Sequence, residues 1–72
     1  MKKIRLIDLL LLVADKKIKD GQMVLIDDDC YRFDKNEEKF YLPKDNGSYR
    51  VIRTYDMNLT CYILESYIEE EG

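Results

Sequence analysis

Side chains suited to catalysis are sparse in this sequence of 72 residues. Histidine, the commonest general acid or base, is absent, and the only cysteines are Cys30 and Cys61. A cysteine nucleophile needs an activating base or a lowered pKa, and no basic motif accompanies either thiol. Ser48 and Ser66 stand outside any nucleophile-elbow pattern, and three separated glycines form no phosphate-binding loop. We therefore predict no catalytic residues and no enzymatic activity.

The acidic residues favour solvated turns over metal sites. The run Asp27–Asp29 is typical of a turn between two strands. The spacing of Asp34, Asn36 and Glu38 is similar to the start of a calcium loop. However, Lys39 replaces the glycine that such a loop requires, and the residues after it favour a strand. Zinc and iron prefer clustered cysteine and histidine, so we predict no metal site and no cofactor.

Length and composition predict one small globular domain over residues 1–72. The apolar fraction of 46% suits a folded chain, and the net charge of −3 gives little attraction to a polyanion. A secreted domain of this size usually carries more than two cysteines, so a reducing cytoplasm is favoured over a Cys30–Cys61 disulfide. The basic start is similar to a signal peptide, but Asp8 interrupts the apolar stretch and no small-residue cleavage site follows Ala14. We expect no membrane anchor.

The elements expected to organise these side chains are a helix and several strands. Apolar residues recur at helical spacing over 6–15, with Asp8 and Asp15 on the opposite side, so we predict an amphipathic helix there, preceded by an extended segment over 3–6. Leu12 is anomalous because it projects away from the centre of the apolar arc. After Gly21 the period changes to two, and residues 22–26 are apolar on both faces, which predicts a central strand.

Further strands are expected over residues 30–34, 39–42 and 48–55. Asn46 and Gly47 favour a tight hairpin turn before the last of these, since both accept positive φ. The end of the chain is ambiguous, and we favour an irregular or helical turn over 59–64 followed by a strand over 66–70. The predicted fold class is α+β, with the N-terminal helix packed on an antiparallel meander of four to five strands.

Several segments match a known pattern: Lys3-Ile4, Ile7-Asp8-Leu9-Leu10, Val13-Ala14, Tyr31-Arg32-Phe33-Asp34 and Ile68-Glu69-Glu70-Glu71. By these segments the chain resembles a family of short, mostly uncharacterised proteins encoded in phages and prophages of Gram-positive bacteria. The resemblance spans nearly the whole length and implies a role in the cytoplasm of the host cell, but it carries no activity or functional residue. Leu11 and Leu12 depart from the family, which usually has polar residues there.

Aromatic and basic residues of the predicted strands could form a surface that stacks nucleic-acid bases. These residues are Tyr31, Arg32, Tyr49, Arg50, Arg53 and Tyr55. Tyrosines that alternate along strands are more often packing residues, and the acidic balance argues against phosphate contacts. A nucleic-acid-binding module is therefore the second hypothesis. A DNA-mimicking inhibitor would need the acidic runs 27–29 and 65–71 on one face, for which a net charge of −3 is weak.

The leading hypothesis is protein–protein contact. One helix and a small sheet offer limited room to bury every large apolar residue, and exposed apolar patches on small domains mark interfaces. The interface residues predicted on this ground are Leu11, Leu12, Tyr62, Ile63, Leu64 and Tyr67. The partner is another protein or a second copy of the chain, unless the C-terminal segment covers the leucines itself. We expect a non-enzymatic phage or prophage accessory protein, with an inhibitor of a host enzyme or defence system as a further alternative.

Overall fold

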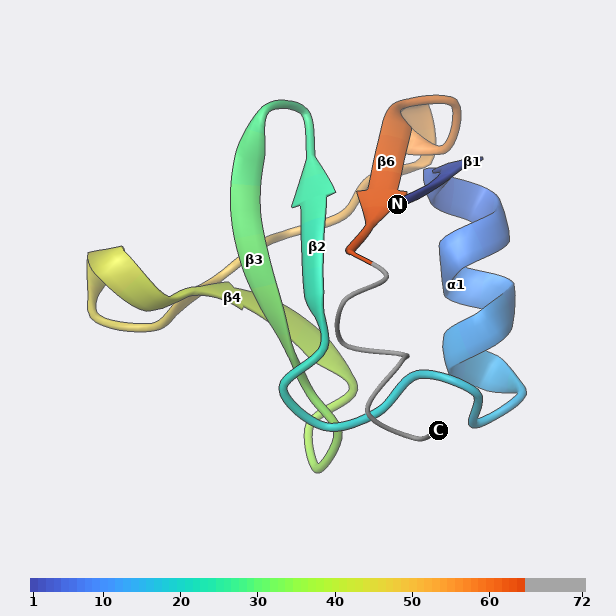
Figure 1. Ribbon diagram of the computed structural model, residues 1–72. Coiled ribbons are helices and arrows are strands. Elements are labelled where there is room, and N and C mark those ends of the chain that lie inside the picture. The colour runs from blue at the N-terminus through green and yellow to red at the C-terminus, as the bar shows by residue number, and fades with distance from the viewer. Residues whose placement is uncertain (65–72) are drawn as a thin grey trace.

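Helix α1 (Leu6–Ala14) begins where the apolar pattern predicts. The computed structural model describes residues 1–64, and within them α1 lies against one face of an antiparallel sheet (Figure 1). Leu6 and Leu9 are fully buried on the sheet side of the helix, whereas Ile7 and Leu11 lie at the surface. The backbone N–H groups of Leu6 and Ile7 donate to the carbonyl oxygens of Leu59 and Met57, which ties the helix start to the segment that leads back into the sheet.

The end of α1 is a Schellman motif. Asp15 is the C-cap, and Lys16 follows in the left-handed region with φ 61°. The N–H of Lys17 donates to the carbonyl oxygen of Leu12 at 2.9 Å, and the N–H of Lys16 donates to that of Val13 at 3.0 Å. This pair of bonds turns the chain sharply, so that the residues after the helix fold back beside Leu12.

Within residues 1–64 the sheet has six strands in the order β1-β6-β2-β3-β4-β5, and every neighbouring pair is antiparallel. The strands are β1 (Lys2–Arg5), β2 (Met23–Ile26), β3 (Asp29–Asp34), β4 (Lys39–Leu42), β5 (Ser48–Tyr49) and β6 (Thr60–Ile63). The predicted α+β class is confirmed. The meander runs from β2 to β5, and β6 returns to lie between β1 and β2, as the predicted central position of β2 requires.

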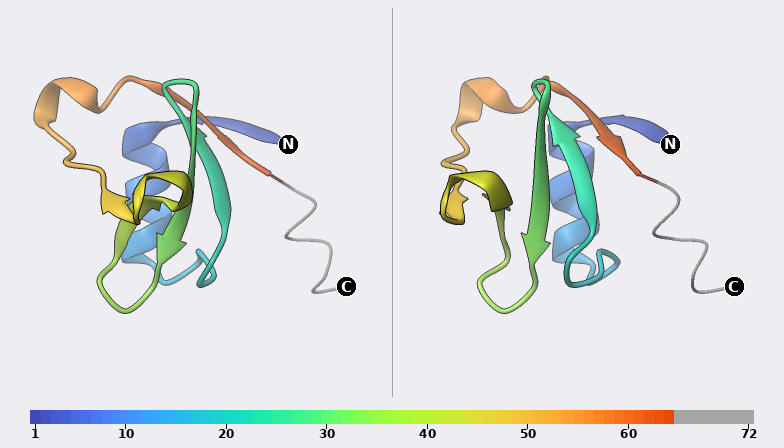
Figure 2. Two further views of the ribbon diagram at one scale, coloured as in Figure 1. Left: turned by 90° about the vertical axis from the view of Figure 1, so that its left-hand side faces the viewer. Right: turned by 60° about the vertical axis from the view of Figure 1, so that its left-hand side comes forward.

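The core lies between α1 and one face of this sheet. The right-hand view in Figure 2 places α1 behind β2 and β3. The buried side chains that form the core are Leu6, Leu9, Ile18, Val24, Ile26, Tyr31, Phe33, Phe40, Cys61 and Ile63. Along each strand they alternate with side chains on the open face, such as Met23 and Leu25 in β2. This alternation agrees with the period of two in the sequence.

The prediction of an irregular or helical turn over residues 59–64 was wrong. The chain there forms β6, in which Cys61 and Ile63 are buried and Thr60 and Tyr62 face the other way. A 3₁₀ turn does occur, but it lies earlier, at Thr54–Asp56. The β-branched and aromatic residues of this segment favour a strand, and as β6 it satisfies the backbone hydrogen bonds of β1 on one side and β2 on the other. The strand expected over 66–70 lies outside the described residues.

The predicted strand over 48–55 is also much shorter than expected. Tyr41 pairs with Tyr49 and Leu42 with Ser48, after which the N–H of Arg50 donates to the carbonyl oxygen of Phe40. Beyond that point β5 has no partner, because β4 begins at Lys39 and the chain before it is a turn. The alternating pattern of residues 51–55 therefore does not correspond to a ladder.

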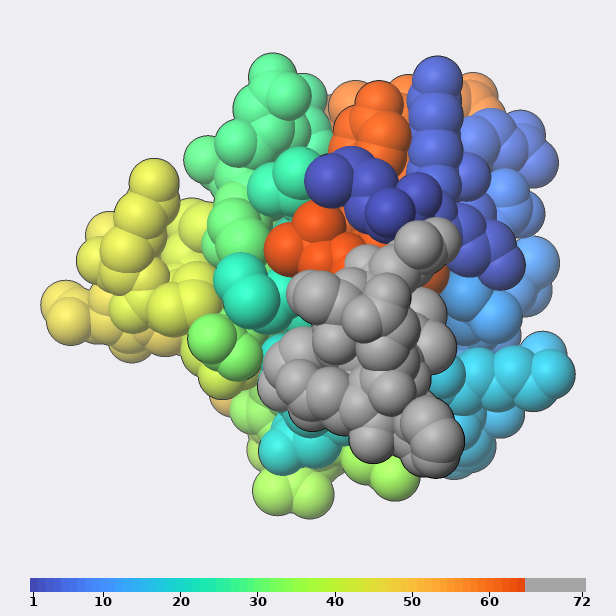
Figure 3. Space-filling view, viewed as in Figure 1, coloured from blue at the N-terminus to red at the C-terminus, as the bar shows by residue number. Residues whose placement is uncertain are grey.

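The loop between β4 and β5 is longer than a two-residue turn. It contains the 3₁₀ turn Pro43–Asp45, followed by Asn46 and Gly47 with φ of 57° and 74°. The expected positive φ at both residues is confirmed, but the tight hairpin is not, because proline starts a helical turn before them. This loop projects from the molecule on the side away from α1 (Figure 3).

Candidate functional site

The candidate site is a groove at the open end of the core, between α1, the loop after it and the end of β6. Leu12, Ile18 and Ile63 form its apolar floor, and its volume is about 300 Å³. Leu12 is half-buried and Ile63 is nearly fully buried. Sequence analysis predicted both residues for an interface, and the structure brings them together. In Figure 3, β1 and β6, which carry two lining residues, lie side by side on the viewed face.

The turn after α1 positions one wall of the groove. The Schellman motif places Lys17 beside Leu12, a contact that commonly accompanies this cap. Ile18 follows at once and is only 6% exposed, so it anchors the loop in the core. Sequence analysis did not single out Ile18, although a lone isoleucine between charged residues is the signal that could have found it.

Gln22 fixes the opposite wall. Its side chain is 3% exposed and its amide nitrogen donates to the carbonyl oxygens of Met23 and Leu64, each at 3.3 Å. The N–H of Leu64 also donates to the carbonyl oxygen of Met23. A buried amide that bridges two strands in this way holds the end of β6 at a set distance from the start of β2. The groove is therefore a built feature of the fold.

The rim of the groove is basic. Lys2 from β1 and Lys17 and Lys19 from the loop after α1 line it, and no acidic side chain is among the described lining residues. Lysines are the charged residues among the described side chains that line the groove. Sequence analysis missed this cluster, because Lys2 is distant in sequence from the other two.

The remaining predicted interface residues do not join the groove. Leu11 is 58% exposed, and it neighbours Ile7 on the outer side of α1. Tyr62 faces the open side of the sheet, where it pairs with Leu25. Leu64 contributes its carbonyl oxygen to the bond from Gln22. Tyr67 lies outside the residues that the structure describes.

The residues proposed for nucleic acid do not share a surface. Tyr31 is 3% exposed and belongs to the core, and its hydroxyl accepts a hydrogen bond from Arg50 at 3.0 Å. Arg32 lies on the opposite face of β3 and donates to the carbonyl oxygen of Gly21. Tyr55 is 80% exposed in the 3₁₀ turn that follows Arg53. No row of stacked aromatic side chains connects these positions.

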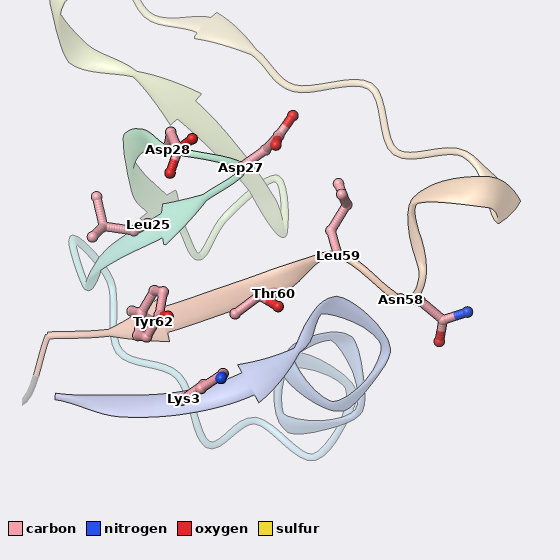
Figure 4. Close-up of a pocket in the computed structure, with 8 residues that line it drawn as sticks. All are labelled: Lys3, Leu25, Asp27, Asp28, Asn58, Leu59, Thr60 and Tyr62. Carbon is pink, nitrogen blue, oxygen red and sulfur yellow. The ribbon is translucent and has the colours of Figure 1, made fainter.

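A second, more polar cavity of about 440 Å³ lies beside the turn between β2 and β3. Figure 4 shows the residues that line it: Lys3, Leu25, Asp27, Asp28, Asn58, Leu59, Thr60 and Tyr62. Asp27 and Asp28 come from the turn, while Thr60 and Tyr62 come from β6. Within residues 1–64 no group of three side chains is arranged to hold a metal ion. This cavity does not assemble a recognisable reactive set.

Asp34 and Tyr49 form a polar contact at the far end of the sheet. The Tyr49 hydroxyl donates to a carboxylate oxygen of Asp34 at 2.8 Å, and the other oxygen accepts the N–H groups of Asn36 and Glu37. The hydrogen bond from Tyr49 is the main reason why the pKa of Asp34 lies below its usual value. The same bond raises the pKa of Tyr49. This cluster stabilises the β3–β4 turn.

The two thiols differ in environment. Cys61 is fully buried, and burial raises the pKa of its thiol to about 11. Cys30 is partly exposed, and both cysteines are free. A thiol that resists ionisation is a poor nucleophile and a poor metal ligand, so Cys61 acts as a packing residue.

The fold and the groove define a small α+β domain with a lysine-rimmed apolar groove. Comparison with known proteins gives no family model, no curated protein and no solved structure that matches this chain. Among residues 1–64, no helix has the length and apolar character needed to cross a bilayer.

Proposed function

We propose that this protein is a non-enzymatic binding protein, which acts by seating part of another protein in the groove above Leu12 and Ile63. The observation that carries the proposal is the meeting of these two side chains with Ile18 at the open end of the core. An apolar floor with a polar rim is the usual anatomy of a protein-binding site.

The location and origin of this function are part of the same proposal. The resemblance of the chain to phage and prophage proteins of Gram-positive bacteria favours a role in the host cytoplasm. The free state of Cys30 and Cys61 supports a reducing compartment. A second copy of the chain, or a host enzyme or defence protein, is the kind of partner that such an accessory protein would contact.

The test is capture of a partner from host lysate by the full-length chain, with mass spectrometry to identify it. Leu12→Asp, in the groove, and Leu11→Asp, one position away on the outer side of α1, form a matched pair. We expect Leu11→Asp to retain a partner that Leu12→Asp loses, because a charged side chain on the groove floor must give up its hydration when a partner covers it. Far-ultraviolet circular dichroism checks that each variant is folded.

Size-exclusion chromatography at high protein concentration tests self-association in the same variants. If the wild type forms an oligomer, Leu12→Asp should convert it to a monomer. The proposed function would be overturned if Leu12→Asp is folded, captures the same partner as the wild type and has the same oligomeric state. Lys17→Glu, at the rim, gives the same information if Leu12→Asp does not fold.

A further inference from the structure

We infer that Asn46 is a site of spontaneous covalent modification, at which the side-chain amide is converted to a carboxylate, and that the loop between β4 and β5 controls the rate. The sequence predicted only a turn at Asn46 and Gly47, and the proposed function does not use them. The inference is independent of that function. It follows from the chemistry of the pair, from its exposure and from the conformation in which the loop holds it.

The reaction needs only the chain and water. The backbone nitrogen of Gly47 loses its proton to a base in the solvent and attacks the side-chain Cγ of Asn46. A bond forms between these two atoms, the Cγ–Nδ2 bond breaks and ammonia leaves, so that a cyclic succinimide remains. Water then adds to either carbonyl group of the ring and opens it, which gives aspartate or isoaspartate. Glycine favours the attack, because it has no Cβ to hinder its nitrogen.

The position of the pair exposes it to solvent. Asn46 lies at the surface, and the loop that carries it projects from the molecule beyond β4 (Figure 1). Within residues 1–64, β5 is the last strand on this side of the sheet, and β2, β3 and β4 separate it from β6. Water and base therefore reach the Asn46 amide without any change in the rest of the sheet.

The conformation of the closed loop holds the reacting atoms apart. Ring closure requires Cβ of Asn46 and the nitrogen of Gly47 to lie on the same side of the Cα–C bond. With ψ of 25° at Asn46, the tetrahedral geometry of Cα places them nearly opposite each other. The attacking nitrogen is also engaged, because its N–H donates to the carbonyl oxygen of Leu42 at 3.0 Å. The closed loop is therefore unreactive, and the reaction proceeds from an open loop.

Local contacts keep the loop closed. Pro43 starts its 3₁₀ turn, and the hydroxyl of Ser48 donates to the carbonyl oxygen of Asp45 at 2.9 Å. Opening breaks this bond and the one from Gly47 but leaves the pairing of β3 with β4 intact, so it requires less free energy than global unfolding. The rate of modification should follow the fraction of molecules in which the loop is open.

The modified loop differs from the original in its backbone. Isoaspartate adds a methylene group to the main chain between Asp45 and Gly47. The N–H of Gly47 then no longer matches the carbonyl oxygen of Leu42, and the pairing of Ser48 with Leu42 is displaced. Modification at Asn46 would therefore release the edge of the sheet that β5 forms.

The experiment incubates the full-length chain in alkaline buffer, with and without guanidinium chloride at an unfolding concentration, and follows each asparagine by peptide mass spectrometry. Asn36 and Asn58 are internal controls, since glutamate and leucine follow them. In the unfolded chain we expect Asn46 to react fastest of the three. Its rate in the native protein should be lower by about tenfold or more, because only the open loop reacts. Isoaspartate at position 46 identifies the succinimide route, since direct hydrolysis of the amide gives only aspartate.

Variants of the loop test its control of the rate. Ser48→Ala removes one bond of the closed loop and should accelerate the reaction of native protein about two- to tenfold. Its rate in guanidinium chloride should equal that of the wild type. Pro43→Ala, which makes the 3₁₀ turn less favourable, serves the same purpose if Ser48→Ala does not fold. Thr54→Ala, in the other 3₁₀ turn, is the matched control and should leave the rate unchanged.

Three results would overturn the inference. The first is a rate at Asn46 in the unfolded chain no higher than the rates at Asn36 and Asn58. The second is an equal rate at Asn46 in native and unfolded protein, and the third is an unchanged native rate in both loop variants. The capture experiment decides the proposed function separately.

Discussion

At the scale of single residues, the polar side chains of this protein fix turns and strand ends. Asp34 accepts three hydrogen bonds, one from Tyr49 and two from the turn after β3. Gln22 donates across two strands, and Arg50 connects the hydroxyl of Tyr31 to the carboxylate of Asp56, which lies 3.9 Å away. The bonds from Tyr49 to Asp34, from Gln22 to Leu64 and from Arg50 to Tyr31 join residues that are distant in sequence, so these three depend on the fold.

Tyr49→Phe should raise the pKa of Asp34 toward its usual value, because the hydroxyl is the main cause of the lowering. The lowered pKa stabilises the folded protein above pH 3.8, the ordinary value for aspartate, and this contribution is lost as the pH falls through the lower value of the folded state. The free energy of unfolding of Tyr49→Phe should therefore fall less steeply than that of the wild type as the pH is lowered through this acidic range.

Carboxyl chemical shifts followed by NMR during an acid titration measure this pKa directly. Tyr55→Phe is the control, since Tyr55 is exposed and lies in a different turn. An unchanged pKa of Asp34 in Tyr49→Phe would contradict the expected role of the hydroxyl.

At the scale of elements, the turns place several residues other than glycine at positive φ. Lys16 ends α1 in this region, and Glu38 lies in the turn before β4. Asp27 and Asp28 connect β2 to β3 with φ of 51° and 72°, which is the pattern of a type I′ hairpin. Aspartate tolerates this conformation better than most residues, but it still carries a steric cost. The hairpin is thus held by the pairing of the strands.

Asp28→Gly should stabilise the protein by about 0.5–1 kcal/mol, because glycine removes the steric cost at positive φ and this gain exceeds its entropic cost. Urea unfolding monitored by circular dichroism gives the free energy. Asp29→Gly is the matched control, since Asp29 begins β3 in extended backbone. It should destabilise the protein by about 0.5–1 kcal/mol. If both variants lose a similar amount of free energy of unfolding, the backbone at Asp28 is not strained.

At the scale of the whole molecule, the sheet separates the two thiols. Cys61 pairs with Ile26 and points into the core beneath α1, whereas Cys30 pairs with Leu25 on the open face. Side chains on opposite faces cannot approach to bonding distance, so the Cys30–Cys61 disulfide that the sequence left open does not fit this fold.

Native protein should therefore react with a thiol reagent only at Cys30, and Cys61 should react only after unfolding. Burial and the raised pKa of about 11 both protect Cys61. Spectrophotometric titration with a disulfide reagent, with and without urea, measures this. Cys30→Ser should abolish the reaction of the native state and Cys61→Ser should preserve it. Equal reactivity of both thiols in native protein would contradict the assigned faces.

Much of the fold was predictable from local pattern. The helical period at the N-terminus predicted α1, and the period of two after Gly21 predicted β2, β3 and β4. These predictions succeeded because amphipathic spacing reflects a single nearby core. Leu12 and Ile63, both predicted for an interface, line the same groove.

The sequence by itself determined the class of fold and the apolar surplus on α1 and β6. The tertiary structure alone decided where β5 ends, that β6 lies between β1 and β2, and that Lys2 joins Lys17 at one groove. The physical reason is that a strand exists only where a partner strand supplies hydrogen bonds. In the same way, lysines from distant parts of the sequence meet only where the fold brings their segments together. Local spacing fixes which face of an element is apolar, but strand pairing determines what that face meets.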